Sequence, residues 1–250
     1  MFYKKLAVAT LAVSGLQIGV CNSSEMGHWG YEGNTGPAHW GHLSEKYALC
    51  ATGKQQSPID IVTSVKADLP PLTFNYKSIP LTIVNNGHTI KMNADKAGTL
   101  QVGDDSYQLL QFHTHSPSEG AINGKRFDMV IHFVHKSAQS TLAVVAVFLE
   151  KGENPNPLIA SLWKVMPKVA GEPQQHDVQI DINQLLPSKH DYYAFEGSLT
   201  TPPCSEGVKW MVLKQPVSIS AEQLAQYREV YFGNARPLQS LNGRKVFSSN

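Results

Sequence analysis

The chain is poor in charge and contains few cysteines. Of its 250 residues, 16% are charged, against roughly 25% in typical globular proteins, and the formal net charge is +1. No basic cluster is present, which argues against a nucleic-acid partner. The sequence also lacks an apolar run of about 18 residues, so we expect no membrane span. Because it has neither an internal repeat nor a low-complexity linker, it favours one large domain.

The first residues differ in composition from the rest. "MFYKKLAVATLAVSGLQIGVCNSS" has a basic start at Lys4 and Lys5, an apolar stretch and a polar exit. This pattern is typical of a secretory signal peptide rather than of a buried helix. It predicts a leader over residues 1–24, with the cleavage site left open, and a mature domain over residues 25–250. We expect no lipid at Cys21, because Val20 is large where a lipobox has a small residue. The protein is therefore predicted to be periplasmic or secreted.

Two cysteines remain after the leader, Cys50 and Cys204. An exported protein folds in an oxidising compartment, where an even pair usually forms a disulfide. We therefore predict a bond between Cys50 and Cys204, with two free buried thiols as the alternative.

Short segments rich in β-branched residues and separated by turn residues dominate the sequence and predict a mainly β fold with a mostly antiparallel sheet. They are "LTIVNNGHTIKMN", "YQLLQFHTH", "FDMVIHFVHK", "TLAVVAVFLE" and "VKWMVLKQPVSI". Two short helices are also expected. "NPLIASLWKVM" has Asn156 as N-cap and Pro157 at the first helical position, and "SAEQLAQYREVYFG" has a capping box from Ser220 to Gln223 and ends at Gly233.

Histidines stand on two of these predicted strands. Side chains alternate faces along a strand, so His113 and His115 share a face, together with Gln111. If the strand around His132 pairs in the same sheet, its imidazole comes beside the other two. His135 then lies on the opposite face and is predicted to be structural. Three neutral histidines with an open fourth position are typical of a catalytic zinc site.

A second interpretation of the same residues is a cupin metal site. "HTHSPSE" fits the pattern His-x-His-x-x-x-Glu, in which Glu119 would be a fourth ligand. A cupin needs a second motif with Gly, Pro and His at set positions, and the segment around His132 lacks it.

Seven segments in order carry a resemblance to a known family. They are "HWGY", "GPAHW", "QSPIDI", "NNGH", "QFHTH", "IHFVH" and "GSLTTPPC", running from His28 to Cys204, with "NGRKVF" near the C-terminus. The chain resembles the α-class carbonic anhydrases of secreted bacterial type over essentially its whole mature length. The resemblance implies a large central, twisted sheet with a zinc cleft, and reversible hydration of carbon dioxide to bicarbonate and a proton. This family is itself the standard example of zinc lowering the pKa of bound water to about 7.

The resemblance also implies residue roles. His113, His115 and His132 match the Zn²⁺ ligands, and Gln111 matches an acceptor that orients His113. Thr200 matches the hydroxyl that accepts a hydrogen bond from zinc-bound hydroxide, and Glu119 the carboxylate that fixes that hydroxyl. His88 matches the proton shuttle. The substrate-binding positions are Val134, Val144, Leu199, Thr201 and Trp210, and the proton network includes Tyr31 and Asn86.

Two positions depart from the family pattern. Many members have a glutamate two residues before the third ligand, where it accepts the free N–H, but here the position is Val130. Asp128 is too far along the strand to replace it. Lys91 stands where a neutral amide is usual, and we expect its charge to lower the pKa of His88.

Some proteins of this type are non-catalytic and act in recognition, but those generally lack zinc histidines, so the enzyme interpretation is favoured. The expected partners are therefore carbon dioxide and bicarbonate, in one-carbon metabolism. The oligomeric state is left open, and a homodimer is one of the states that the sequence allows.

Overall fold

A computed structural model describes residues 27–250. The predicted leader and its cleavage site lie outside these residues. None of the helices described is long and apolar enough to cross a membrane. The four α-helices are α1 (Trp40–Leu43), α2 (Leu49–Thr52), α3 (Pro157–Lys164) and α4 (Ala221–Arg228), and the 3-10 helices are η1 (Gly33–Thr35), η2 (Glu45–Tyr47) and η3 (Ile182–Leu185).

The strands are β1 (Asp60–Ile61), β2 (Val65–Lys66), β3 (Leu72–Tyr76), β4 (Ile79–Asn85), β5 (Ile90–Asn93), β6 (Gly98–Val102), β7 (Asp105–His115), β8 (Ala121–Ile122), β9 (Met129–Ser137), β10 (Leu142–Lys151), β11 (Gln174–Ile180), β12 (Tyr192–Ser198), β13 (Glu206–Leu213), β14 (Val217–Ile219) and β15 (Phe247–Ser248). Thirteen of them form one sheet, whose main path is β11-β4-β5-β7-β9-β10-β13-β12-β15-β2. Most neighbours in it are antiparallel, as predicted. The parallel pairs are β10–β13, β10–β14 and β15–β2, so the sheet is mixed.

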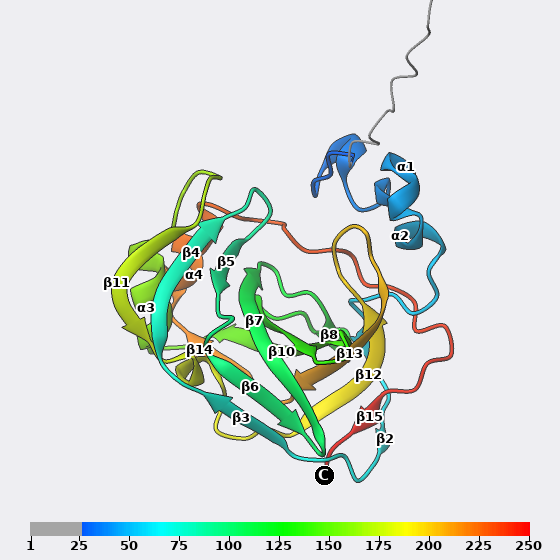
Figure 1. The fold of residues 1–250 in the computed structure, drawn as a ribbon. Helices are drawn as coiled ribbons and strands as arrows, with labels where there is room; N and C mark the ends of the chain where they lie inside the picture. The colour runs from blue at the N-terminus through cyan, green and yellow to red at the C-terminus, as the bar shows by residue number, and fades with distance from the viewer. Residues whose placement is uncertain (1–26) are drawn as a thin grey trace, which may run out of the picture.

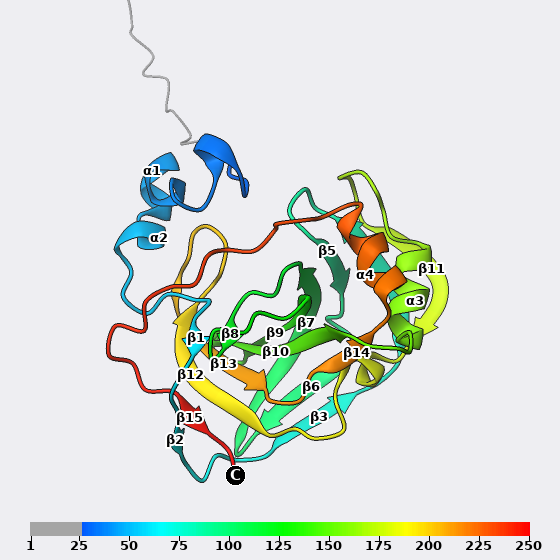
Figure 2. The same ribbon diagram turned by 180° about the vertical axis from the view of Figure 1, so that it is seen from behind.

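The sheet is strongly curved, and its helices stand at two places around it (Figure 1). Helices α3 and α4 lie together beside β4 and β11, whereas α1 and α2 lie on the far side, near the β12–β13 connection (Figures 1 and 2). Two apolar clusters cover the two faces of the sheet. The larger contains Phe112, Phe133 and Leu162 and packs against α3 and α4. The smaller contains Val130, Val144 and Trp210 and lies on the opposite face.

The predicted helices form, but both end earlier than expected. The Asn156 side chain accepts a hydrogen bond from Ile159 N (3.0 Å) and caps α3, and both bonds of the Ser220–Gln223 capping box are present in α4. Helix α4 ends at Arg228 instead of continuing to Gly233. After a turn in which Val230 N and Tyr231 N donate to Tyr227 O, Gly233 N donates to Ser116 O directly after β7 (2.8 Å), so this segment is bonded to the end of a strand instead of continuing the helix.

The predicted disulfide is also present. Cys50, in α2, is bonded to Cys204, which directly follows the "SLTTPP" segment, across a sequence separation of 154 residues. The bond therefore ties the N-terminal helices to the loop that carries Thr200.

Candidate metal centre

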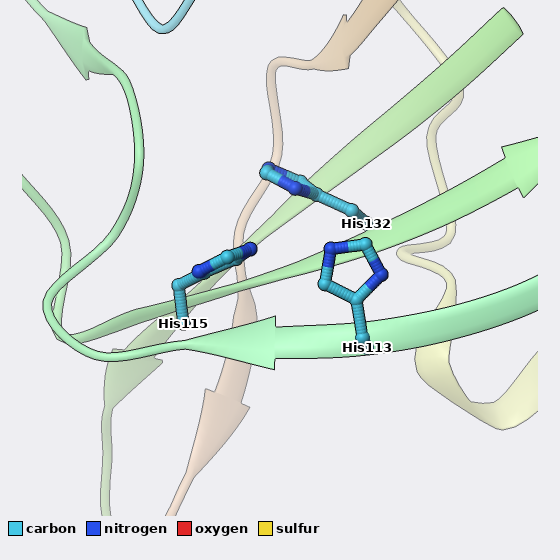
Figure 3. A group of neighbouring side chains, drawn as sticks. All are labelled: His113, His115 and His132. Atoms are coloured by element: carbon cyan, nitrogen blue, oxygen red, sulfur yellow. The ribbon is translucent and has the colours of Figure 1, made fainter. Parts of the chain in front are cut away.

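The three predicted zinc ligands converge on one face of the sheet. His113 and His115 come from β7 and His132 from the neighbouring β9, where His113 and His132 are directly opposite in the register (Figure 3). Each histidine offers one ring nitrogen to a group in which all these atoms lie within 4.8 Å of one another. The ring centroids are 4.9 to 5.4 Å apart. The alternation of side chains along the two strands therefore produces the predicted cluster.

Two of these imidazoles are oriented by oxygen acceptors. His113 Nδ1 lies 2.9 Å from Gln111 Oε1, as predicted, and His115 Nδ1 lies 2.6 Å from the backbone oxygen of Asn234. Because a carbonyl oxygen only accepts, each Nδ1 carries the proton and each Nε2 keeps its lone pair. His115 Nε2 is buried and has no hydrogen-bond partner. A buried nitrogen with a free lone pair, next to two others, is what a metal ion requires.

Two of the three histidines, His113 and His132, are held in the neutral form. Burial, and then the neighbouring histidines, lower the pKa of His132 well below its ordinary value. Burial, His115 and the Lys91 ammonium do the same for His113. Since only neutral imidazole binds a metal, the site is ready to bind one at neutral pH. These residues fit a zinc ion with three histidine ligands and an open fourth position.

His132 differs from the other two ligands in its surroundings. Its Nε2 is buried without a hydrogen-bond partner, and Val130, which stands where many relatives have glutamate, is fully buried in the apolar cluster. Asp128 does not replace that glutamate. Its carboxylate accepts from Lys151 N (2.9 Å) and lies 3.7 Å from Arg228. The third ligand is therefore positioned by packing, including the Trp210 ring, whose centroid is 5.0 Å from that of the imidazole.

Glu119 lies beneath the cluster, but it is not part of the metal-binding group. Its Oε1 accepts from Arg236 N (2.7 Å). Its Oε2 is buried without a hydrogen-bond partner, 3.6 Å from His115 Nε2 and 4.0 Å from His132 Nδ1. The expected hydrogen bond between Glu119 and Thr200 is therefore not formed in this structure, although Thr200 is also buried.

The predicted apolar wall lies beside His132. Val144 and Trp210 are buried in the smaller cluster, and Val134 and Leu199 pack against it. Trp210 Nε1 donates to Ser198 O (3.0 Å), which anchors the indole next to the loop that carries Thr200. Gly197 leaves room for this ring, since a Cβ there would lie 2.9 Å from Trp210 Cδ1.

A cleft of about 140 Å³ leads from the histidines to solvent. Its lining includes the predicted proton-network residues and Thr201. The lining residues are Trp29, Tyr31, Asn86, His88, Thr89, Lys91, Gln111, His113, His115 and Thr201. Asn86 Oδ1 accepts from His88 N (3.0 Å) and Thr89 N (2.9 Å), which fixes the turn that carries His88. Burial, first of all, raises the pKa of Tyr31 well above its ordinary value, so its hydroxyl stays protonated.

The prediction that the charge of Lys91 lowers the pKa of His88 names the wrong cause. The pKa of His88 is lowered, but by partial burial and then by the charge of His28. Lys91 acts instead on His113, which it directly opposes in the β5–β7 register.

Sequence reasoning missed three residues of the site. Asn234 and Arg236 reach it from a segment more than 110 residues away in the chain, and no local pattern signals them. Trp29 stacks on His88, with ring centroids 3.7 Å apart and planes within 7°. Trp29 lies in the "HWGY" segment, so the sequence motif indicated that it is near the cleft. Nothing in the sequence indicated that it stacks on His88.

The family model for eukaryotic-type carbonic anhydrase matches residues 35–250. A carbonic anhydrase of Pectobacterium carotovorum is 45% identical over 235 residues, covering 92% of this chain and 96% of that protein. One from Neisseria gonorrhoeae is 46% identical over 221 residues, covering 88% and 87%. The chain belongs to the α-carbonic anhydrases.

Solved α-carbonic anhydrases have the same fold. The enzyme from Thermovibrio ammonificans, in complex with the inhibitor sulfanilamide, aligns with a TM-score of 0.84 at 46% identity and covers 88% of this chain and 99% of that one. Membership in this family makes the chain a zinc-dependent carbonic anhydrase, which interconverts carbon dioxide and bicarbonate, and the three-histidine group fits that cofactor. The cupin interpretation is wrong, because the fold is that of this family and Glu119 stands outside the ligand group.

The same fold also occurs in a protein whose name is not that of a carbonic anhydrase. Dioscorin, solved in complex with ascorbate, is 32% identical to this chain with a TM-score of 0.81, covering 88% of this chain and 97% of that one. The role of each residue must therefore be argued from the geometry and chemistry of the site.

Proposed function

We propose that His113, His115 and His132 hold one Zn²⁺ at the base of the cleft, and that Gln111 and the Asn234 carbonyl keep two of them in the metal-binding tautomer. The buried, unpartnered Nε2 of His115 supports this assignment most directly. When bound, zinc supplies a Lewis acid that makes a water molecule nucleophilic at neutral pH.

Glu119 and Thr200 orient the reacting oxygen. Glu119 Oε2 can only accept while it is ionised, and it is buried without a donor. When the Thr200 hydroxyl turns to donate to it, the hydroxyl oxygen is left as an acceptor for the nucleophile. The lone pair used for attack is then directed at the substrate carbon, which is a positioning effect.

The apolar wall next to His132 holds carbon dioxide. Val134, Val144, Leu199 and Trp210 offer a surface that suits a small apolar molecule and binds the charged product less well. Thr201, which also lines the cleft, is the polar neighbour on the substrate side.

His88 carries the proton to solvent. It is half-buried at the cleft, and its lowered pKa leaves it neutral and able to accept a proton at neutral pH. Tyr31 and Asn86 line the same cleft as His88 and two of the zinc ligands, and they would order the water in it.

We also place the mature protein in the periplasm or outside the cell, where its substrate is carbon dioxide or bicarbonate. The Cys50–Cys204 disulfide supports an oxidising compartment. Cell fractionation with N-terminal sequencing of the purified protein would test this location. An intact residue 1 in the cytosolic fraction would contradict it.

The roles of Thr200 and Glu119 are tested by stopped-flow carbon dioxide hydration at a matched zinc content. Thr200→Val removes the hydroxyl, and kcat/KM should fall about 100-fold, in the range for loss of one preorganised hydrogen bond. Thr200→Ser keeps the hydroxyl and should retain most activity. Equal losses in both variants would contradict the orienting role. A wild-type protein that holds zinc and hydrates no carbon dioxide would instead favour a binding function.

A further inference from the structure

Lys91 places a positive charge in the zinc cleft. Its side chain is half-buried and lines the cleft, and within the described part of the chain no aspartate or glutamate is among the lining residues. None of the ion pairs formed by residues 27–250 contains Lys91. Glu119, which lies beneath the cluster, approaches His115 and His132 instead. The ammonium is therefore not neutralised by an ion pair and can act on a molecule that enters the cleft.

The strand register places Lys91 beside the zinc ligands. Lys91 in β5 is directly opposite His113 in β7, and His113 is directly opposite His132 in β9. Opposite residues on neighbouring antiparallel strands point to the same face, with Cβ atoms about 4.5–5.5 Å apart. After burial and His115, the charge of Lys91 is the third cause that lowers the pKa of His113. The field of the ammonium therefore reaches the ligand group.

The two sides of the histidine cluster differ in polarity. On the His132 side, Val144 and Trp210 are buried in the smaller apolar cluster. On the Lys91 side, the lining of the cleft is mainly polar and includes Gln111. A small neutral molecule is therefore favoured on one side of the ligands, and a small anion on the other.

We propose that Lys91 and the zinc site form an anion subsite, in which the ammonium attracts bicarbonate and other small monovalent anions toward the metal position. The proposal rests on the zinc site proposed above. The attraction is strengthened in a cleft, because protein walls have a lower dielectric constant than water and focus the field. Carbon dioxide is uncharged, so Lys91 distinguishes the two reaction partners by charge. The neutral amide that is usual at this position does not supply this attraction.

The anion affinity of the zinc-loaded protein measures this effect, because the reaction equilibrium fixes the ratio of kcat/KM in the two directions for every variant. Calorimetric titration with thiocyanate gives a Kd, and product inhibition of carbon dioxide hydration gives a Ki for bicarbonate. Lys91→Gln should raise both constants about three- to tenfold, as expected for one charge pair lost from a partly solvated site. The difference from the wild type should shrink as ionic strength rises, because salt screens the attraction.

Three further variants and a metal-free sample separate the charge of Lys91 from its shape and from net charge. Lys91→Arg keeps the cation and should retain wild-type affinity, whereas Lys91→Met keeps an unbranched side chain without the charge and should match Lys91→Gln. Lys96→Gln removes one charge from an exposed position just after β5, outside the cleft lining, and should change neither constant. Wild type stripped of zinc should bind thiocyanate far more weakly, because the subsite needs both charges.

Unchanged anion affinity in Lys91→Gln would overturn the proposal. So would equal losses in Lys91→Gln and Lys91→Arg, which indicate a structural role, an equal loss in Lys96→Gln, which indicates net charge alone, or thiocyanate binding that survives metal removal. Zinc content and carbon dioxide hydration of the wild type are recorded in the same samples. Any of these results in a zinc-loaded, active protein contradicts the anion subsite alone, whereas a wild type that takes up no zinc contradicts the proposed function and the subsite with it.

Discussion

Histidines on the two faces of the paired strands β7 and β9 have opposite surroundings. His135 packs in the larger cluster, and both its ring nitrogens have protein partners: the Tyr76 hydroxyl at 2.5 Å and Ala143 O at 3.3 Å. Burial lowers the pKa of His135 to about 4, so its imidazole is neutral and has no ring nitrogen left for a metal. On the other face, His113 and His115 each have one ring nitrogen bound, and His132 has neither. Burial alone therefore does not mark a metal ligand. An incomplete set of partners on converging rings does.

Removing one histidine from either face of the sheet should have the largest effect and tests the difference between the faces most strongly. His113→Ala, His115→Ala and His132→Ala should each lose most zinc and nearly all hydratase activity, because residues 27–250 hold no fourth ligand in this group that could substitute. His135→Ala should keep zinc and activity while losing stability by about 1–3 kcal/mol, since it leaves the buried Tyr76 hydroxyl without its partner. Zinc content by mass spectrometry and thermal unfolding separate the two classes. Zinc loss in His135→Ala, or full activity in His132→Ala, would contradict the assignment.

The next effect concerns the loop on the zinc face. The Cys50–Cys204 bond fixes the end of the segment that carries Thr200. Reduction should lower stability by roughly 2–5 kcal/mol, as for other disulfides that close long loops, and should lower activity as well. Thermal unfolding and hydration assays with and without reductant measure both. An unchanged melting temperature after complete thiol exposure would contradict this role.

Val130 gives a sharper test of how His132 is held. Val130→Glu should slow zinc loss to a chelator by about 10–100-fold, the usual value of a missing partner to a metal-bound histidine. Val130→Leu, which adds volume without an acceptor, is the control and should show no such slowing. A rate of zinc loss that is unchanged or faster in Val130→Glu would mean that packing alone already secures the ligand, or that the site rejects the charge.

The smallest effect concerns proton transfer. His88→Ala should lower kcat at low buffer concentration by about tenfold and leave kcat/KM nearly unchanged. The loss stays below the ~10²–10⁴ typical of groups in the chemical step, because buffer can replace a shuttle. Imidazole buffers should restore much of it. Because partial burial and His28 lower the pKa of His88, the wild-type midpoint for this step should lie below the ordinary 6.5. An equal fall in kcat and kcat/KM would place His88 in the chemical step.

Much of the site could be predicted, because its core depends on local alternation. The parity of His113, His115, His132 and His135 is a property of two continuous strands, and it was confirmed. Strand β11 was missed, because an exposed edge strand of sequence "QQHDVQI" has no apolar alternation. Helices α1 and α2 have four residues each, too short for a 3.6-residue period.

Long-range contacts set the limit of prediction. Asn234 and Arg236 reach the ligand His115 and the Glu119 carboxylate through backbone atoms. The Asn234 amide also bonds the backbone of His88 and Ser116, but these contacts span more than 110 residues, so no local pattern signals them. The charge that acts on His88 was misassigned for a related reason. Lys91 is close in sequence, but its side chain belongs to the face of His113, whereas His28 arrives from the N-terminal segment.

The central claim is that three histidines on one face of the sheet hold the single zinc on which hydration depends. It is tested most directly by removing metal from the purified protein with a chelator and titrating zinc back while carbon dioxide hydration is measured. The account predicts no activity without metal, a linear return that ends at one zinc per chain, and no return in His132→Ala. Activity that survives metal removal, or that requires more than one zinc per chain, would contradict it.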